Sequence, residues 1–583
     1  MASKKRKKPK GLEHPANKAS EQIFSAGPKD KSTKRSLDAI PARDWRFLAA
    51  AVAIVVVAFL LRIYRIGEQE LWVDEAGSFY LMTTPNWLRS LLNDNTPPLY
   101  YLLLRAWVRA GGYSEAALRL LSAGLGTLFV AALIWVGREF FNIRTGLWSG
   151  WFGAIAPIHI YYSQEARAYT LLLLALLLTY VSCWRALKSN TLMSWILVVT
   201  SALLALYSHY FAIFGLTPAA LLFVIWPEKQ QVKRFWLRAG GAGVLTGLLF
   251  LPWLLLGFVF MPHSLAGILW IQDAWQRTPP LLAIPKSLEL FGLGSQAGLL
   301  PIAMKQFNYL DFPASLRHLG LVVIFLLGIW VAIPWGEKQL GLPWLARRKA
   351  WLWTLLFFPL ATLWLVSFYR PLYVAGRYDL VAFPAFIILL GFALAKIQTI
   401  KEIGPLLACL VALILFIPIG TKLYLYYQVP PLPDAQPTAK LIDANVKNGD
   451  VVVFTRLRGL PVLYYLHRLG YQWKEGSCEN LATGRRFACR AFPREAEEDP
   501  RFYDPDRVLN SSEEARKDVQ DFMTTLGPAR AFWVAFHSSN FSMGRLEVPT
   551  PDSLLVEELE RLGFYPTSMS TDEVTDIYRF ARW

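Results

Sequence analysis

Residues 47–63 read FLAAAVAIVVVAFLLRI, a run that is apolar except for Arg62 near its end and is long enough to cross a lipid bilayer as one helix. Similar runs recur along the chain as far as residue 426. Of all 583 residues, 54% are hydrophobic and 18% are charged, a composition too apolar for a soluble protein of this size. The sequence therefore predicts an α-helical polytopic membrane protein.

The number of membrane crossings is expected to be about eleven. The first run follows a long polar leader and has no small-residue cleavage site after it, so we expect it to remain as an uncleaved span. The expected spans cover residues 47–63, 116–136, 146–162, 169–187, 192–208, 211–226, 236–258, 319–335, 351–368, 380–395 and 404–426.

Basic residues predict which side of the membrane each loop faces. Residues 1–45 are Lys-rich and contain too little apolar material to fold, so they are expected to form a disordered cytoplasmic arm. The loops expected on the same side are also basic, namely residues 138–144, 185–188, 229–238, 338–349 and 396–401. This distribution explains the net charge of +17 without nucleic acid as a partner. It predicts a plasma (inner) membrane protein with a cytoplasmic N-terminus.

The chain is expected to comprise the arm, a transmembrane domain at residues 46–427, and an extracytoplasmic α/β domain at residues 428–583. In the last domain, strands are expected at residues 451–455, 531–536 and 576–580, and helices at residues 460–468 and 553–562. It contains no phosphate-binding loop and no catalytic-triad spacing. Its expected role is accessory: it either covers the active face or presents the acceptor.

The four cysteines divide between these two regions. Cys478 and Cys489 lie in the domain placed outside, where the compartment permits oxidation, so they are expected to form a disulfide. Cys183 and Cys409 lie within expected spans and should stay free. All four cysteines unpaired is the alternative.

Two adjacent carboxylates, Asp74 and Glu75, follow the first span within the stretch Leu71-Trp72-Val73-Asp74-Glu75-Ala76-Gly77-Ser78. A carboxylate beside an indole at a membrane surface offers a general base and an apolar platform for a sugar ring. The alternative is structural, because acidic residues favour helix N-termini and Asp74 could simply cap a short surface helix. The next segments, residues 78–92 and 99–108, are expected to lie in the membrane interface.

Further polar residues lie at the outer ends of later spans. Glu165 and Arg167 follow Tyr161-Tyr162-Ser163, and their clustering favours a polar cavity over simple snorkelling to the interface. His209 could carry protons, although a lone histidine in a tight turn is more often structural. Arg377, before Tyr378, adds a fixed cation at the same level.

An ordered set of motifs from residue 50 to residue 390 resembles the membrane glycosyltransferases of the GT-C class. The bacterial relatives of protein O-mannosyltransferases (family 39) and of the lipid A aminoarabinose transferase are the nearest in pattern. The motifs are Trp72-Val73-Asp74-Glu75-Ala76, Pro97-Pro98-Leu99-Tyr100-Tyr101, Ser114-Glu115-Ala116-Ala117-Leu118-Arg119-Leu120, Tyr161 to Tyr169, His209-Tyr210-Phe211 and Gly376-Arg377-Tyr378.

This resemblance implies roles for individual residues. Asp74 and Glu75 would be the catalytic residues, Asp74 as the general base and Glu75 as its neighbour in the motif. The donor would be a sugar on a polyprenyl phosphate. Many relatives carry a histidine or lysine just before the Pro-Pro pair, near the donor phosphate or a metal, whereas this chain has Asn95-Thr96. Either Arg167 or Arg377 does more of the work at the phosphate, or metal use is absent. We expect no metal and no other cofactor, with a divalent metal as the alternative. The residues expected to bind donor phosphate or substrate are Glu165, Arg167, Arg377, Tyr378, Thr96, Tyr100 and His209.

One base and one leaving group on opposite faces of the sugar imply inversion at the anomeric carbon. The acceptor hydroxyl could belong to a lipid, a glycan or a protein. Two other functional classes fit the topology, a polytopic transporter and a membrane scaffold or sensor. A transporter should carry charges or broken helices near the membrane midplane, and the centres of these spans are nearly free of charge.

Overall fold

The computed structural model describes residues 42–83, 87–92, 96–225, 232–260, 271, 275–276, 279–294, 314–333, 343–428, 435–455, 459–474, 476–492, 512–526, 529–537, 551–571 and 575–582. The expected cytoplasmic arm, residues 1–45, lies almost entirely outside these ranges. From Ala49 to Trp583 the described residues belong to one compact unit.

The helices of the transmembrane part are α1 (Ala42–Ile63), α2 (Val73–Thr83), α3 (Trp87–Leu92), α4 (Leu99–Gly111), α5 (Glu115–Phe140), α6 (Ile143–Ile155), α7 (Pro157–Ser163), α8 (Tyr169–Ser189), α9 (Leu192–Ser208), α10 (Ala212–Val224), α12 (Lys233–Phe260), α14 (Pro280–Leu293), α16 (Ala314–Ala332), α17 (Pro343–Ser367), the 3-10 helix η4 (Asp379–Ala382), α18 (Phe383–Ile397) and α19 (Gly404–Gln428). Side-chain caps begin several of them: Ser114, Asn142 and Thr191 accept hydrogen bonds from amides in the first turns of α5, α6 and α9.

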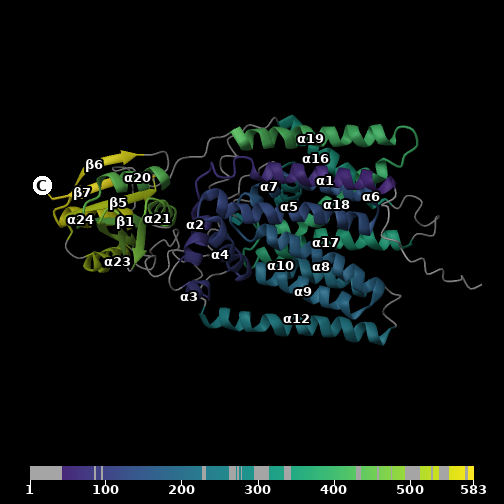
Figure 1. Ribbon diagram of the computed structural model, residues 1–583, viewed down its shortest axis with the longest axis horizontal. Helices are drawn as coiled ribbons and strands as arrows, with labels where there is room; N and C mark the ends of the chain where they lie inside the picture. The colour runs from purple at the N-terminus through teal and green to yellow at the C-terminus, as the bar shows by residue number, and fades with distance from the viewer. Residues whose placement is uncertain are drawn as a thin grey trace, which may run out of the picture. The chain divides into compact units, whose positions relative to one another are not determined.

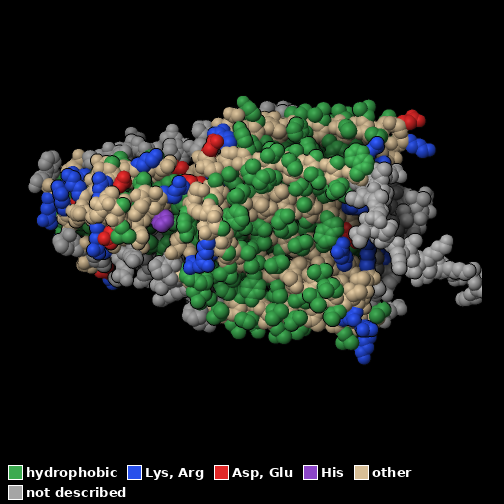
Figure 2. Space-filling view, in the orientation of Figure 1, with side chains coloured by type: hydrophobic (Ala, Val, Ile, Leu, Met, Phe, Trp, Pro, Cys, Tyr) green, Lys and Arg blue, Asp and Glu red, His purple; other side chains and the backbone are tan. Residues whose placement is uncertain are grey.

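Seven of the described helices are long and apolar enough to cross a membrane. They contain residues 45–63, 115–140, 169–189, 233–256, 347–367, 379–397 and 404–428, and three shorter apolar helices cover residues 192–208, 212–224 and 318–332. The long helices lie side by side (Figure 1), and hydrophobic side chains cover most of the visible face of the bundle (Figure 2). The prediction of a polytopic helical membrane protein is confirmed, while the count of about eleven crossings stays a prediction.

The span expected at residues 146–162 is not one helix. It divides into α6 and α7 at Ala156, whose ψ of 115° is extended, because proline at position 157 disfavours the helical conformation of the residue before it. Proline also lacks an amide hydrogen, so carbonyls at the end of α6 lose their helical donors. The buried guanidinium of Arg62 donates to the Gly153 and Ala154 carbonyls at 3.1 Å and replaces those donors.

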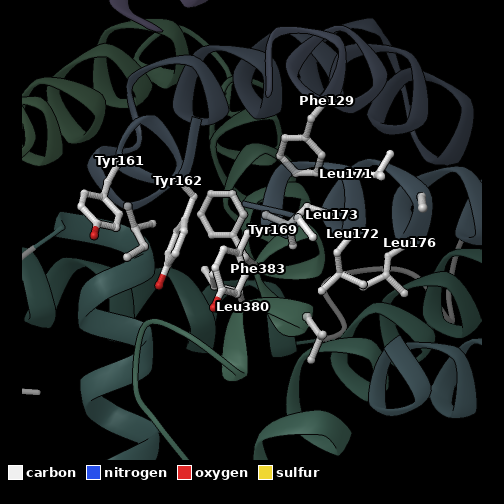
Figure 3. Packing of buried hydrophobic residues seen from close by; sticks show 14 of the residues in the cluster. Phe129, Tyr161, Tyr162, Tyr169, Leu171, Leu172, Leu173, Leu176, Leu380 and Phe383 are labelled. Carbon is white, nitrogen blue, oxygen red and sulfur yellow. The ribbon is translucent and has the colours of Figure 1, made fainter. Parts of the chain in front are cut away.

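Close helix packing in the bundle depends on small residues. A Cβ on Gly391 of α18 would lie 2.7 Å from the backbone nitrogen of Ser149 in α6, and one on Gly146 of α6 would lie 2.4 Å from the Ile134 carbonyl of α5. Around these contacts the interior is continuous: Figure 3 shows side chains of α5, α7, α8 and α18 together in one buried cluster.

The C-terminal part is a three-layer α/β domain. Its strands are β1 (Val451–Thr455), β2 (Tyr471–Lys474), β3 (Ser477–Asn480), β4 (Arg485–Phe492), β5 (Ala531–His537), β6 (Tyr565–Thr571) and β7 (Thr575–Ala581), and its helices are α20 (Ala435–Asn445), α21 (Gly459–Arg468), α23 (Ser512–Thr525) and α24 (Pro551–Arg561). The sheet order is β2-β3-β4-β1-β5-β7-β6, with β1 parallel to both β4 and β5. The other described pairings are antiparallel.

The two faces of this sheet belong to different cores, because successive strand residues point to opposite sides. Val452 and Phe454 of β1 join the large core that runs through α21 into the bundle, whereas Val451 and Val453 join a separate core with α23 and α24. One face of the sheet therefore shares a hydrophobic core with the membrane part.

The predicted disulfide is confirmed. Cys478 on β3 and Cys489 on β4 are bonded, with their Cα atoms 5.9 Å apart, while Cys183 and Cys409 are free. The bond joins adjacent antiparallel strands near one edge of the sheet.

We expect Gly391→Ala to destabilise the bundle by about 1–3 kcal/mol, because the added methyl group forces the α6 and α18 backbones apart. The thermal midpoint of the detergent-purified protein measures this loss. Gly241→Ala in α12 is the matched control, since a Cβ there would meet no atom within 4 Å. Equal midpoints for the two variants would contradict the packing argument.

Candidate active site

Asp74 lies in the first turn of α2 and forms an ion pair with Arg377. The Arg377 Nη2 atom is 2.6 Å from Asp74 Oδ2, and the Asp74 side chain is 26% exposed, so solvent or a ligand can reach it. The helix begins at Val73, which places Asp74 inside the helix rather than at its cap. The observed partner of the carboxylate is the guanidinium of Arg377.

Arg377 is fixed in a buried turn between α17 and η4. Gly376, with φ 78°, makes the turn, and its carbonyl accepts a hydrogen bond of 2.6 Å from the Tyr162 hydroxyl. The Arg377 Nε atom donates to the Tyr169 hydroxyl at 2.7 Å. A guanidinium held at both its Nε and its Nη2 atom presents a defined cation to the site.

Aromatic rings surround this cation. The centroids of Trp72, Tyr169 and Tyr378 each lie 5.8 Å from the Arg377 guanidinium carbon. This distance is within the range of cation–π attraction. The rings therefore help to hold the cation, and Trp72 lies only two residues before Asp74.

The charge of the Asp74 carboxyl is set by opposing effects. Burial acts to raise its pKa, but the charges of Arg377 and Arg167 and the hydrogen bond from Arg377 outweigh it, so the pKa lies below its ordinary value. Asp74 is therefore ionised at neutral pH. In this arrangement it is a weak base, because Arg377 stabilises its charged form.

Glu75 points away from Asp74 into a buried ion pair with Arg119 of α5. Arg119 Nε and Nη2 each lie 2.7 Å from a Glu75 oxygen, and the two side chains are 4% and 1% exposed. Arg119 also donates to the backbone carbonyls of Ile66, Gln69 and Glu70. This one guanidinium thus anchors both the loop before α2 and the first turn of α2.

The turn between α7 and α8 is held against the same carboxylate. Glu75 Oε1 accepts a hydrogen bond of 2.9 Å from the Ala166 amide. Arg167 donates to the Tyr101 hydroxyl at 2.9 Å, while its own carbonyl accepts from Ser122. The structure therefore connects Glu75 to the turn that carries Glu165 and Arg167.

Glu165 is 3% exposed, and its Oε2 atom accepts no hydrogen bond from any residue that the structure describes. Burial raises its pKa to about 8, with the charge of Arg377 opposing this rise and those of Glu75 and Asp74 adding to it. The carboxyl is therefore mainly protonated at pH 7. In that form it can donate a hydrogen bond to a ligand oxygen.

The other predicted site residues lie around this centre. The Tyr378 ring stacks on Phe211 at 4.2 Å and lies 6.0 Å from the His209 ring. Burial, together with Arg167 and Arg377, lowers the His209 pKa to about 3, so the imidazole is neutral at physiological pH. Tyr100 is fully buried with its hydroxyl 2.7 Å from Ser122 Oγ, and Thr96 is buried just before α4.

Two arginines of the framework were not assigned by the sequence analysis. Arg119 was part of a quoted motif, and Arg62 ends the first span; both interrupt apolar segments. An ionisable residue inside an expected span is itself a signal, because it must find partners in the protein interior. Their partners, Glu75 for Arg119 and the end of α6 for Arg62, follow only from the tertiary structure.

Among the residues that the structure describes, no group of three or more His, Cys, Asp and Glu side chains is arranged to hold a metal ion. The expectation of a metal-independent site stays a prediction. The charged groups around the accessible carboxylate of Asp74 are the guanidinium groups of Arg377 and Arg167.

A family model described as dolichyl-phosphate-mannose-protein mannosyltransferase matches residues 95–255. This region includes Arg119, Glu165, Arg167 and His209, and it ends within α12. A sequence search of curated proteins gives no match.

Solved structures resemble nearly the whole chain. ArnT from Cupriavidus metallidurans bound to undecaprenyl phosphate has a TM-score of 0.55 and 13% identity, covering 92% of this chain and 98% of that one. The apo form of the same protein gives the same TM-score and coverage at 11% identity. The oligosaccharyltransferase AglB from Archaeoglobus fulgidus has a TM-score of 0.45 and 12% identity, covering 73% of this chain and 64% of that one. The ArnT likeness confirms the predicted GT-C fold, and with the family match it indicates a glycosyltransferase.

We expect Glu75→Gln to destabilise the protein by about 3 kcal/mol or more, because it leaves the buried Arg119 charge uncompensated. The thermal midpoint and the yield of folded protein measure the loss. Glu139→Gln is the control: its pairs with Arg185 and Lys188 are longer, at 3.9 and 3.6 Å, and partly exposed. Such pairs contribute about 0–1 kcal/mol. A Glu75→Gln protein as stable as the Glu139→Gln protein would contradict the anchoring role.

Proposed function

We propose that this chain transfers a sugar from a polyprenyl-phosphate donor to an acceptor hydroxyl on the extracytoplasmic side of the membrane. The observation that carries the proposal is the ion pair between Asp74 and Arg377, which places an accessible carboxylate beside a fixed cation. The description of the matched family names a dolichyl-phosphate sugar, and the ArnT structure contains undecaprenyl phosphate. Both descriptions support a lipid-phosphate donor.

In the proposed reaction, Asp74 accepts the proton of the acceptor hydroxyl as that oxygen attacks the anomeric carbon. The bond from this carbon to the phosphate oxygen breaks on the opposite face, so the configuration inverts. The leaving polyprenyl phosphate takes the bonding electrons and is already stable as an anion, so it needs no strong acid.

Arg377 and Arg167 are proposed to hold the donor phosphate. A planar guanidinium can form two parallel hydrogen bonds to phosphate oxygens, which a lysine ammonium cannot. Arg377 would then divide its charge between the phosphate and Asp74. Because Arg377 lowers the pKa of Asp74, donor binding should raise that pKa and make the carboxylate a stronger base.

Glu165 and Tyr378 are proposed to contact the substrate, and Glu75 to orient α2. A protonated Glu165 adds no negative charge next to the donor phosphate and can donate to a sugar or phosphate oxygen. Thr96, Tyr100 and His209 would complete the surroundings. The acceptor is a lipid, a glycan or a protein.

The extracytoplasmic location rests on two features. The basic loops predict a cytoplasmic N-terminus, which puts the turns of Asp74, Glu165 and Arg377 on the opposite side. The disulfide between Cys478 and Cys489 suits an oxidising compartment, and its domain contacts the segment that leads into α2.

Transfer of labelled sugar from a polyprenyl-phosphate donor by the purified protein tests the proposal. A labelled product covalently attached to an acceptor is the expected result. Movement of the intact donor across vesicles without a new glycosidic bond would instead support a transporter. Donor binding without turnover, across lipid, glycan and protein acceptors, would support a scaffold or sensor.

Asp74→Asn should lower transfer by roughly a hundredfold or more, because it keeps the size of the side chain and removes the proton acceptor. Binding of the polyprenyl-phosphate sugar should persist, measured as donor affinity in the same preparation. If the charge of Asp74 only stabilised the first turn of α2, its loss should lower stability by about 0.3–1 kcal/mol and leave transfer near the wild-type rate. Transfer near the wild-type rate would therefore remove Asp74 as the base.

Arg377→Ala should weaken use of the donor more than use of the acceptor, and Arg377→Lys should restore only part of the activity. The kinetic constants for donor and acceptor, measured separately, check this expectation. Arg167→Ala should show the same pattern. Unchanged donor dependence in either alanine variant would make that arginine purely structural.

A further inference from the structure

We propose that helix α21 of the C-terminal domain belongs to the active-site framework, and that Tyr465 is a positioning residue for Asp74. The effect on catalysis rests on the proposed function, in which Asp74 is the base. The claim that the C-terminal domain fixes the start of α2 rests on contacts between α21, α20 and the segment that leads into α2. It gives the C-terminal domain a role other than presenting the acceptor.

The first contact fixes the entry to α2. The Leu71 amide donates to the Tyr465 hydroxyl at 3.1 Å, and Leu71 and Tyr465 are 2% and 3% exposed. Leu71 lies three residues before Asp74 and outside any helix. A buried amide that loses its partner is costly, so this bond holds the backbone at one position.

The neighbouring residue is held by both parts of the protein. The Glu70 carboxylate accepts hydrogen bonds from the Ala435 and Gln436 amides, at 2.8 and 3.1 Å, at the start of α20. The Glu70 carbonyl accepts from Arg119 Nη2 of the bundle at 2.9 Å. The C-terminal domain and the bundle therefore meet at the residue that precedes Leu71.

A second set of contacts holds α2 beyond Asp74. Phe79 of α2 packs edge-on against Tyr464 of α21, with centroids 5.0 Å apart. The Tyr464 hydroxyl donates to the Tyr113 carbonyl at 2.9 Å, and Arg468 pairs with Glu115 at 2.6 Å. These contacts link α21 to the start of α5, the helix that carries Arg119.

Asp74 thus lies between two points that α21 fixes, Leu71 before it and Phe79 after it. Catalysis by a positioned base depends on its placement, and a displacement of about 1 Å can cost up to a hundredfold in rate. The ion pair between Asp74 and Arg377 also requires that both side chains keep their positions. Without α21, the first turn of α2 would be held from the bundle side alone.

The test compares Tyr465→Phe with Tyr471→Phe in the full-length protein. Tyr465→Phe keeps the ring and removes the acceptor for the Leu71 amide. Tyr471→Phe removes a hydroxyl of the same domain that donates to Asp443 of α20 at 2.8 Å and not to the segment that leads into α2. The readouts are hydrogen–deuterium exchange of residues 66–78, donor affinity, and the turnover number with saturating donor.

We expect Tyr465→Phe to speed exchange in residues 66–78 and to lower turnover roughly tenfold, with donor affinity unchanged. Tyr471→Phe should change neither the exchange nor the turnover. In an Asp74→Asn background, Tyr465→Phe should cause no further loss, because both changes act through the same carboxylate.

Unchanged exchange in Tyr465→Phe would overturn the positional role. Faster exchange with wild-type turnover, or a full additional loss in the Asp74→Asn background, would overturn its link to Asp74. A wild-type protein that transfers no sugar would instead contradict the proposed function. In that case the exchange experiment still decides whether α21 holds the entry to α2.

Discussion

The buried ion pair between Arg119 and Glu75 is the interaction on which the site depends. Two opposite charges removed from water are favourable only when their remaining hydrogen-bonding groups are also satisfied. Here Arg119 donates to three loop carbonyls, and Glu75 also accepts from the Ala166 amide. The pair therefore links α2, α5 and the turn before α8. Of these elements, α2 carries Asp74 and the turn before α8 carries Arg167.

A broken helix brings that turn to its place. Proline at position 157 ends α6, and the donors lost there are replaced by Arg62 from the first span. Gln164, in the turn after α7, donates to the Arg62 and Tyr64 carbonyls, and its oxygen accepts from Tyr426. The first and last helices of the bundle are thus tied to the same turn. A conformational break that would be costly in lipid is stabilised here because Arg62 supplies donors to the Gly153 and Ala154 carbonyls.

In the proposed reaction, the Asp74–Arg377 pair must meet two requirements that oppose each other. A base must accept a proton, whereas a neighbouring cation favours the charged form and lowers basicity. A phosphate that shares Arg377 would reconcile them, because part of the positive charge would then compensate the phosphate. Tyr169 and the Gly376 turn keep the guanidinium in place, so this exchange needs little movement of the backbone.

The sequence by itself determined the class of the protein, because hydrophobic runs and basic loops follow from the solvation of each residue. It also placed Asp74, Arg167 and Arg377 among the candidate site residues, and the structure brings Asp74 and Arg377 together. It also gave the disulfide, because only two cysteines lie outside the spans. The break at Ala156 follows from the proline at position 157, a local signal that the span prediction did not use. The sequence did not determine that Glu75 turns away from Asp74 toward Arg119, or that Tyr465 meets Leu71. Those depend on contacts between residues 44 to 394 positions apart, which local periodicity does not encode and only the packed chain decides.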